Sequence, residues 1–179
     1  MSFSYNLADN QKAERKLLVT AVNTGGANPV WTVIGAGVED SSIEYNADTE
    51  TVRDILGITE TDVKGTEPQQ DFEPMTIRGG NPLQEMLEDI MERNALSELS
   101  QFDVLIIKAY KESINDGATV YYAEKHTGCT IIPTAIGGSG HVDMPIEIHY
   151  SNNKVQGFVN AYKHSDNITF TAGEPDGHR

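Results

Sequence analysis

Five side chains of the kinds that bind metals or act in catalysis fall within one stretch of 24 residues in the last third of the chain. They are His126, Cys129, His141, Asp143 and His149. Their spacing, His-x-x-Cys followed by His-x-Asp, does not match the ligand spacing of closed zinc sites. Cys129 lacks the flanking signature of a catalytic thiol, so a small buried residue is the better interpretation. We therefore expect no metal and no catalytic nucleophile here.

Two glycine-rich stretches could in principle bind phosphate groups. Residues 137–140, Gly-Gly-Ser-Gly, lack the Lys-Ser/Thr pair of a P-loop and open no helix, so a connection between strands is expected. Gly79 and Gly80 precede a predicted helix, whose free N–H groups could hold an anion, but the neighbouring acids oppose this. We interpret Glu85 and Glu88 as part of the solvated face of this helix. The sequence predicts no catalytic residue, no cofactor and no enzyme activity.

The composition suits a single domain with a core. The chain has 179 residues, 38% of them hydrophobic and 22% charged. No apolar run approaches the ~18 residues that span a bilayer, and the first 16 residues lack the apolar segment of a secretory signal. A single cysteine forms no internal disulfide, which makes a reducing compartment the default expectation.

The net charge of −14 is concentrated in the middle of the chain. Between Glu39 and Glu98 there are 16 acidic and 4 basic residues. Ordinary nucleic-acid binding requires the opposite sign. Two interpretations stay open: the acids serve solubility, or they form a surface that must not adhere to a polyanion.

The clearest secondary-structure signal is a helix at about 80–94. Asn81 is a good N-cap, Pro82 suits the first helical position, and Gln84 stands where a capping-box side chain would reach back. The apolar positions then recur at helical spacing. They predict a stripe that packs on a sheet, made of Leu83, Met86, Leu87 and Ile90, with Met91 beside them.

Most of the remaining chain predicts short strands. Their ranges are 17–22, 31–36, 42–48, 103–110, 119–126, 129–136, 144–150 and 155–162, with a short final strand at 167–171. Asn115-Asp116-Gly117 is a turn signal that would join two of them in a hairpin. In 42–48 apolar and polar residues alternate, which predicts a half-buried strand with a polar face. The expected fold is mainly β: a sandwich or barrel of about eight antiparallel strands with one flanking α-helix.

Three segments fall outside this pattern. Residues 1–16 read as an N-terminal arm and 173–179 as a C-terminal tail, on either side of a domain at 17–172. Residues 49–74 form a long acidic excursion, within which 52–58 could be a short helix or a strand. Such an excursion inside a small domain is unusual and often functional.

The order of these elements resembles the major tail tube proteins of long-tailed bacteriophages. The resemblance covers about 17–172 and rests on short matches in a fixed order. They are a W-x-x-I-G-x-G stretch at 31–37, the alternating strand at 42–48, Gly80-Asn81-Pro82 where the family has Gly-Asp-Pro, Asp116-Gly117-Ala118 in the hairpin, and Asn152-Asn153 before Gly157 near the end. Asn81 keeps the cap that the usual Asp would provide.

The resemblance implies a structural virion protein. Such subunits form a β-sandwich or barrel and assemble into stacked hexameric rings around a hollow tube. DNA and a tape-measure protein occupy the lumen, and tail tip and terminator proteins bind the ends. The implied location is the virion tail, with host cytoplasm during assembly and no membrane partner for the free subunit. On this basis 49–74 is expected to bridge rings, and Glu44, Asn46, Asp48 and Glu50 to face the lumen.

Two alternatives remain open at this stage. The chain could be the tube protein of a contractile tail or secretion system. It could instead be a soluble β-barrel module or enzyme that uses His126, His141 and His149 around a small ligand or metal.

Overall fold

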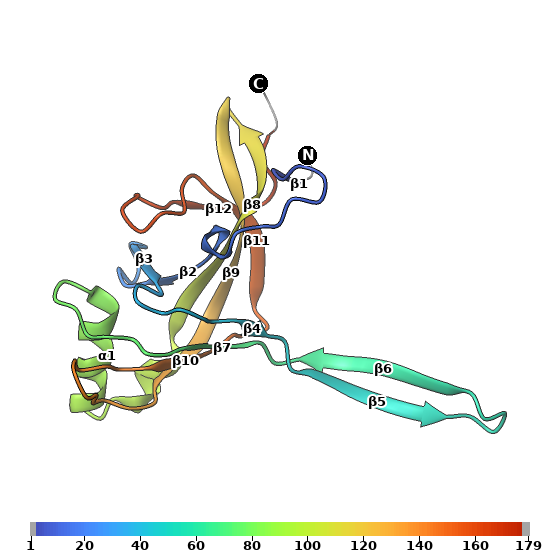
Figure 1. The fold of residues 1–179 in the computed structure, drawn as a ribbon, viewed down its shortest axis with the longest axis horizontal. Coiled ribbons are helices and arrows are strands. Elements are labelled where there is room, and N and C mark those ends of the chain that lie inside the picture. The colour runs from blue at the N-terminus through green and yellow to red at the C-terminus, as the bar shows by residue number, and fades with distance from the viewer. Residues whose placement is uncertain (1–2, 177–179) are drawn as a thin grey trace.

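Two long neighbouring strands, β8 (Phe102–Asn115) and β9 (Ala118–Pro133), run through the molecule, and the other strands of the main sheet pair with them directly or through a neighbour (Figure 1). The computed structural model describes residues 3–176. The turn between β8 and β9 has positive φ at Asp116 (48°) and Gly117 (76°). This backbone twist matches that of paired strands, and it confirms the hairpin predicted from the sequence.

The strands form one curled antiparallel sheet. Its main order is β3 (Trp31–Ile34), β2 (Leu18–Asn23), β8, β9, β10 (Ile146–His149), β7 (Gln69–Phe72) and β4 (Ile43–Glu44). Three more strands attach beside this path: β1 (Ser4–Tyr5) pairs with β8, β11 (Lys154–Val159) with β9, and β12 (Phe170–Ala172) with β11. The mainly β, antiparallel architecture with a flanking helix is the one the sequence predicts.

The curl of the sheet comes from β9, which has two different neighbours along one edge. Its first half pairs with β11, from Tyr121 to His126, and its last four residues pair with β10. Gly128 lies between the two halves at φ 74°, opposite an irregular register in β8. The prediction of two separate strands at 119–126 and 129–136 is wrong because this glycine bends one continuous strand rather than ending it.

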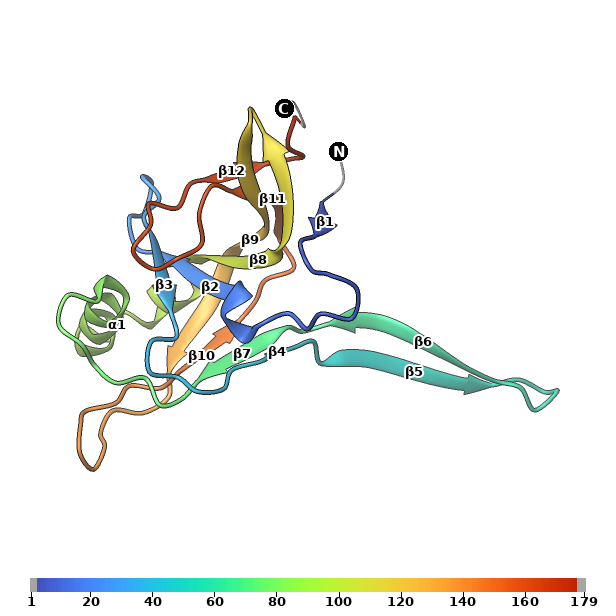
Figure 2. The same ribbon diagram turned by 45° about the horizontal axis from the view of Figure 1, so that its top comes forward.

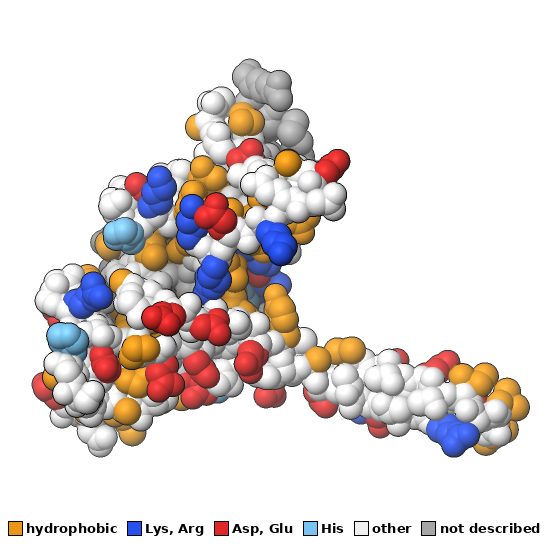
Figure 3. Space-filling model, in the orientation of Figure 1, with side chains coloured by type: hydrophobic (Ala, Val, Ile, Leu, Met, Phe, Trp, Pro, Cys, Tyr) orange, Lys and Arg blue, Asp and Glu red, His pale blue; other side chains and the backbone are white. Residues whose placement is uncertain are grey.

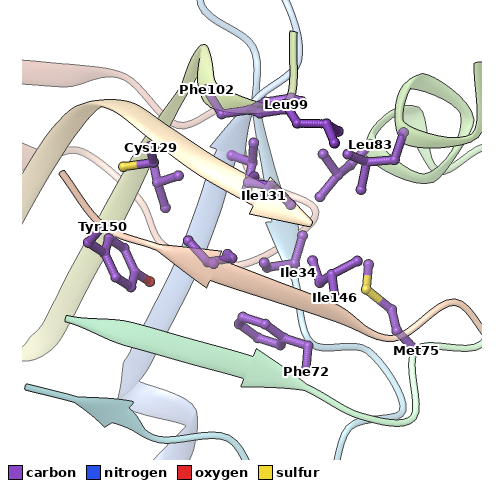
Figure 4. Close-up of a cluster of buried hydrophobic side chains, with 14 of the residues drawn as sticks. Ile34, Phe72, Met75, Leu83, Leu99, Phe102, Cys129, Ile131, Ile146 and Tyr150 are labelled. Carbon is purple, nitrogen blue, oxygen red and sulfur yellow. The ribbon is translucent and has the colours of Figure 1, made fainter. Parts of the chain in front are cut away.

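The curl folds β4, β7 and β10 over one face of β2, β8 and β9, and the main core lies between them (Figure 4). Ile131, Ile146, Ile148 and Phe72 are almost completely buried there. A buried polar group stands in the same layer: the side-chain oxygen of Gln70 accepts hydrogen bonds from Thr20 Oγ1 at 2.9 Å and from the hydroxyl of Tyr150 at 2.6 Å. A second cluster covers the opposite face of β2 and β8, and its members include Trp31, Leu105, Ile107, Val159 and Ile168.

The helix α1 (Pro82–Glu92) closes one end of the main core (Figure 1). Asn81 Oδ1 accepts from the backbone N–H of Leu83 (3.1 Å) and Gln84 (3.4 Å), as an N-cap does. The Gln84 side chain does not close a capping box. It is buried, accepts from Arg78 N and donates to the carbonyl of Thr76, and so ties the helix to the preceding loop. Two short 3-10 turns complete the helical content of residues 3–176, η1 (Arg15–Leu17) and η2 (Leu96–Ser100).

The segment at 42–48 is not the single half-buried strand that its alternation predicts. β4 ends at Glu44, Asn46 has a positive φ of 43°, and a new strand begins at Ala47. Tyr45 is largely exposed instead of facing the core. The alternation breaks here because the chain leaves the domain at this point.

The excursion that follows is a projecting hairpin (Figures 1 and 2). β5 (Ala47–Arg53) and β6 (Thr59–Thr66) pair only with each other, in a two-stranded sheet separate from the main one. Of the helix and strand alternatives for residues 52–58, the structure shows the end of β5 and a turn.

Both ends of the described chain lie against the β8–β9 hairpin. In β1, Ser4 pairs with Glu112 and Tyr5 with Lys111. Near the other end, the backbone N–H of Asp176 donates to Asn115 Oδ1 at 2.9 Å. Residues 1–2 and 177–179, which belong to the expected arm and tail, lie outside the described residues.

Candidate assembly surface

Within residues 3–176, the two strands of the β5–β6 hairpin pair with no other strand. Every residue of both strands is exposed. In most globular domains such a strand pair would be unstable unless one face were covered. Its placement, projecting away from the body in both ribbon views, leaves both faces free (Figures 1 and 2).

The sequence nevertheless specifies the turn at its tip. Asp54 Oδ1 accepts from the backbone N–H of Leu56 and of Ile58, each at 2.8 Å, and Asp54 N donates to the carbonyl of Ile58. Gly57 takes a positive φ of 81°, which a side chain would disfavour. These bonds hold two large apolar side chains outward, since Ile55 is 102% and Leu56 79% exposed.

The two faces of the hairpin differ in chemistry. The pairing places Glu50 opposite Asp62 and Val52 opposite Glu60, so these residues share one face. Lys64 lies on the same face and binds Glu50 at 2.5 Å. The other face carries threonines, and the hydroxyls of Thr51 and Thr61 are 3.1 Å apart. We call the first of these the acidic face.

An exposed apolar tip on a projecting arm is typical of a surface that binds another molecule. Besides Ile55 and Leu56, the exposed apolar side chains of the hairpin are Val52, Ile58 and Val63. The arrangement can provide a contact far from the body of the subunit.

The residues expected to face a lumen lie at the root of this hairpin. Glu44 ends β4, Asn46 stands in the break, and Asp48 and Glu50 belong to β5. All four are exposed, but the break and a bulge between Asp48 and Thr49 mean that they do not form one strand face. Asn46 instead fixes the root, because its side-chain amide donates to the carbonyl of Glu67 at 3.2 Å.

The structure does not assemble the histidines and their neighbours into a site. His149 Nε2 lies 2.7 Å from Glu147, and Asp143 Oδ1 accepts from the hydroxyl of Thr76 at 2.7 Å. Cys129 is completely buried, and this burial raises the pKa of its thiol. Within residues 3–176, no three His, Cys, Asp or Glu side chains are grouped so that they could hold a metal ion.

A charged cluster that the sequence reasoning missed lies on the face shared by β8, β9 and β11. Glu124 is 8% exposed, and its Oε1 accepts from Lys108 Nζ and from the hydroxyl of Tyr122, each at 2.9 Å. Its Oε2 lies 3.7 Å from Lys154 Nζ and 4.0 Å from His126 Nε2. A signal was present in the sequence, since Lys108 follows the apolar run Val104–Ile107 directly and precedes Ala109 and Tyr110.

Electrostatics in this cluster favour the charged forms. Burial alone would raise the pKa of Glu124, but His126, Lys108 and Tyr122 more than offset it, so that this pKa lies well below its ordinary value. Burial would likewise lower the pKa of Lys108, yet the partner carboxylate raises it above the ordinary value. The cluster therefore contains a stable ion pair at neutral pH.

No protein family model and no curated protein matches the sequence. None of the helices within residues 3–176 is long and apolar enough to cross a membrane.

The solved structures similar to the chain include three whose names mention a tube. The sheath/tube terminator of an extracellular contractile injection system, PVC, in the extended state has a TM-score of 0.50 and 13% identity, and covers 83% of this chain and 99% of its own. The PVC sheath-tube complex has a TM-score of 0.45 and 14% identity, covering 81% and 90%. The tube terminating cap of the anti-feeding prophage has a TM-score of 0.46 and 11% identity, covering 94% and 96%. The chain therefore shares the overall fold of the PVC sheath/tube terminator.

Proposed function

We propose that this chain is a structural subunit that assembles with copies of itself into stacked rings, forming the tube of a phage-like tail. The observation that carries the proposal is the β5–β6 hairpin, which exposes five large apolar side chains and pairs with no other strand of the described residues. The fold shared with a tube terminator supports the same reading.

The hairpin suits an assembly built by repetition. Its apolar tip lies at a distance from the body, and we propose that a different surface of the neighbouring copy receives it. A contact between two different patches of the same protein is heterologous, and its repetition gives closed rings or open helical stacks. Both geometries are those of a tube.

In the finer form of this proposal, the rings are hexameric and enclose a lumen for DNA and a tape-measure protein. Tail tip and terminator proteins bind the two ends. The subunit belongs to the virion tail and is present in host cytoplasm during assembly. These features rest on the resemblance of the sequence to phage tail tube proteins.

We further propose that Glu44, Asn46, Asp48 and Glu50 border the lumen and repel phosphates. The test is a particle in which every subunit carries Glu44→Lys and Asp48→Lys. Rings of cations would bind DNA and release counterions, so DNA exit would become slow at low salt and recover at high salt. Normal tubes whose DNA exit is unchanged and insensitive to salt would contradict the lumen assignment.

A second candidate is a tube or terminator protein of a contractile particle. What favours it is that the structure with a TM-score of 0.50 is named as a sheath/tube terminator of a contractile injection system. A terminator would cap a tube made by another protein, whereas a tube protein would extend a tube made of itself. Self-assembly of the purified chain into long tubes would favour a tube protein over a terminator.

The experiment that tests the main proposal changes the hairpin tip. We expect Ile55→Asp with Leu56→Asp to abolish self-association in sedimentation velocity while leaving the circular dichroism spectrum and the melting temperature unchanged, because neither side chain packs on the domain. A matched control is Ile136→Asp, which adds a charge at an apolar residue 61% exposed on another loop. Equal self-association of the tip variant and the wild-type chain would contradict the proposal.

A further inference from the structure

The root of the hairpin borders a cavity of about 110 Å³ between the projecting arm and the body. Tyr45, Thr66 and Pro68 form its wall on the side of the arm. On the side of the body it is lined by Ile106 and by the charged cluster described above, Lys108, Glu124, His126 and Lys154. The cavity thus combines apolar walls with two ammonium groups and one carboxylate.

The cavity is lined by a histidine, His126, that has one ring nitrogen without a hydrogen-bond partner. His126 is 5% exposed, and its Nδ1 lies 2.9 Å from the carbonyl oxygen of Ser151. Since a carbonyl only accepts, Nδ1 carries a hydrogen, and Nε2 faces Glu124 Oε2 at 4.0 Å, beyond hydrogen-bond distance. Among the described residues, Nε2 is the single buried side-chain nitrogen or oxygen without a hydrogen-bond partner. Buried polar groups are normally paired, so this atom indicates that a group from outside the chain completes the site.

The charge of the cavity is unusual for this protein. The cavity contains Lys108 and Lys154 although the molecule has a net charge of −14. A third lysine, Lys111, lies beside the charged cluster, with its Nζ 5.2 Å from the centre of the Tyr122 ring. In the space-filling view, basic side chains gather over the middle of the molecule, whereas acidic ones gather over the lower body and along the arm (Figure 3). An acidic partner would be attracted to this region and repelled by most of the rest of that face.

The acidic face of the hairpin has the reciprocal charge pattern. Beyond its root it offers Glu60 and Asp62, because Glu50 is bound to Lys64 of the same hairpin, whereas the cavity offers two lysines and a single glutamate. Residues 47–66 contain five acids and two bases in total.

We infer that this cavity is the receptor for the acidic face of the β5–β6 hairpin of a second copy of the chain. The inference rests on the proposed function and concerns the acidic face of the hairpin, a contact separate from that of its apolar tip. Because the cavity lies at the root of the arm, each copy receives one hairpin where its own begins and extends its own to the next copy. The contact is heterologous and therefore propagates along a ring or a stack.

The test reverses one charge at the receptor. Lys154 is suitable because its side chain is 43% exposed and its contact with Glu124 is long, at 3.7 Å. We expect Lys154→Glu to weaken self-association at least about tenfold in sedimentation velocity, as loss of a complementary charge at an interface does. Lys163→Glu makes the same charge change on an exposed loop and should leave the association constant unchanged.

Rescue makes the test specific for the hairpin. Glu60→Lys with Asp62→Lys should restore the association of the Lys154→Glu chain, whereas Glu85→Lys with Glu92→Lys, an equal charge change on helix α1, should not. If Lys154→Glu associates like Lys163→Glu, or if both pairs rescue equally, the receptor assignment is overturned while self-assembly stands. If the wild-type chain shows no self-association at all, the receptor and the proposed function are both contradicted.

Discussion

At the scale of single residues, Leu87 is the centre of the contact between helix and sheet. It is completely buried, as is Leu83, and Ile90 is 2% exposed. We expect Leu87→Ala to lower the free energy of unfolding by about 2–5 kcal/mol, because the substitution removes apolar contacts and leaves a cavity. Urea denaturation of the monomer measures this change.

Met91 on the same helix provides the control. It is 44% exposed, so Met91→Ala should change the free energy of unfolding by less than about 0.5 kcal/mol. A loss of that small size for Leu87→Ala as well would show that the apolar stripe does not contribute to the core.

Glu124 should make the free energy of unfolding fall as the pH is lowered. Its pKa lies below the value of about 4.3 expected in the unfolded chain. The ionised carboxylate therefore stabilises the fold fully above about pH 5, and this contribution is lost as the pH falls toward the lower pKa of the folded state. We expect the unfolding free energy of Glu124→Gln to fall less steeply than that of the wild-type chain between about pH 5 and pH 2.

The matched control for that measurement is Glu92→Gln, at an exposed helix position. It should keep the pH slope of the wild-type chain. Identical slopes for all three proteins would show that the ion pair of Glu124 with Lys108 does not distinguish the folded from the unfolded state.

Residue types predicted the helix stripe well but not the charged cluster. The period of Leu83, Leu87 and Ile90 depends only on helix geometry, and the structure buries all three, with Met86 partly buried beside them. The contact of Lys108 with Glu124 depends instead on the register between β8 and β9, where Lys108 pairs with Tyr122 and Ile106 with Glu124. A register between strands cannot be read from either strand alone.

At the scale of elements, the hairpin and the N-terminal arm should change most on assembly. The hairpin is an exposed two-stranded ribbon, and β1 contributes only two paired residues. Such elements open locally at low free-energy cost. We expect backbone amides of residues 3–16 and 47–66 to exchange quickly in the free subunit and to be protected in the assembly.

The central part of β8 serves as the internal reference, since Leu105 and Ile107 are buried and should be protected in both states. Equal protection of the hairpin before and after assembly would argue against its role as a bridge between copies.

The sequence predicted an element boundary correctly where a turn sets it. It predicted boundaries wrongly where pairing with distant strands sets them. Asp116-Gly117 fixed the β8–β9 turn from local backbone preferences. Gly128 lies in the gap between the strands predicted at 119–126 and 129–136, but it only bends β9, which pairs with β11 before it and with β10 after it. The alternation at 42–48 was real in sequence, yet the hairpin begins inside it. Whether a polar strand faces solvent or a neighbouring copy is not encoded in its period.

At the scale of the whole molecule, an acidic chain carries a basic cavity at the root of an acidic arm. Most of its charge of −14 would oppose association of identical copies. A contact between unlike patches overcomes this repulsion locally and fixes one orientation. Assembly should therefore strengthen as added salt screens the net charge, then weaken once the salt screens the specific contact as well.

The most direct test of the account is electron microscopy of the purified wild-type chain at high concentration, beside the Ile55→Asp, Leu56→Asp variant. The account predicts rings or tubes on the order of a hundred ångströms wide for the wild-type chain, a size that follows from several domains around a lumen, and single particles for the variant. Single subunits in both samples, or identical tubes in both, would contradict assembly through the hairpin.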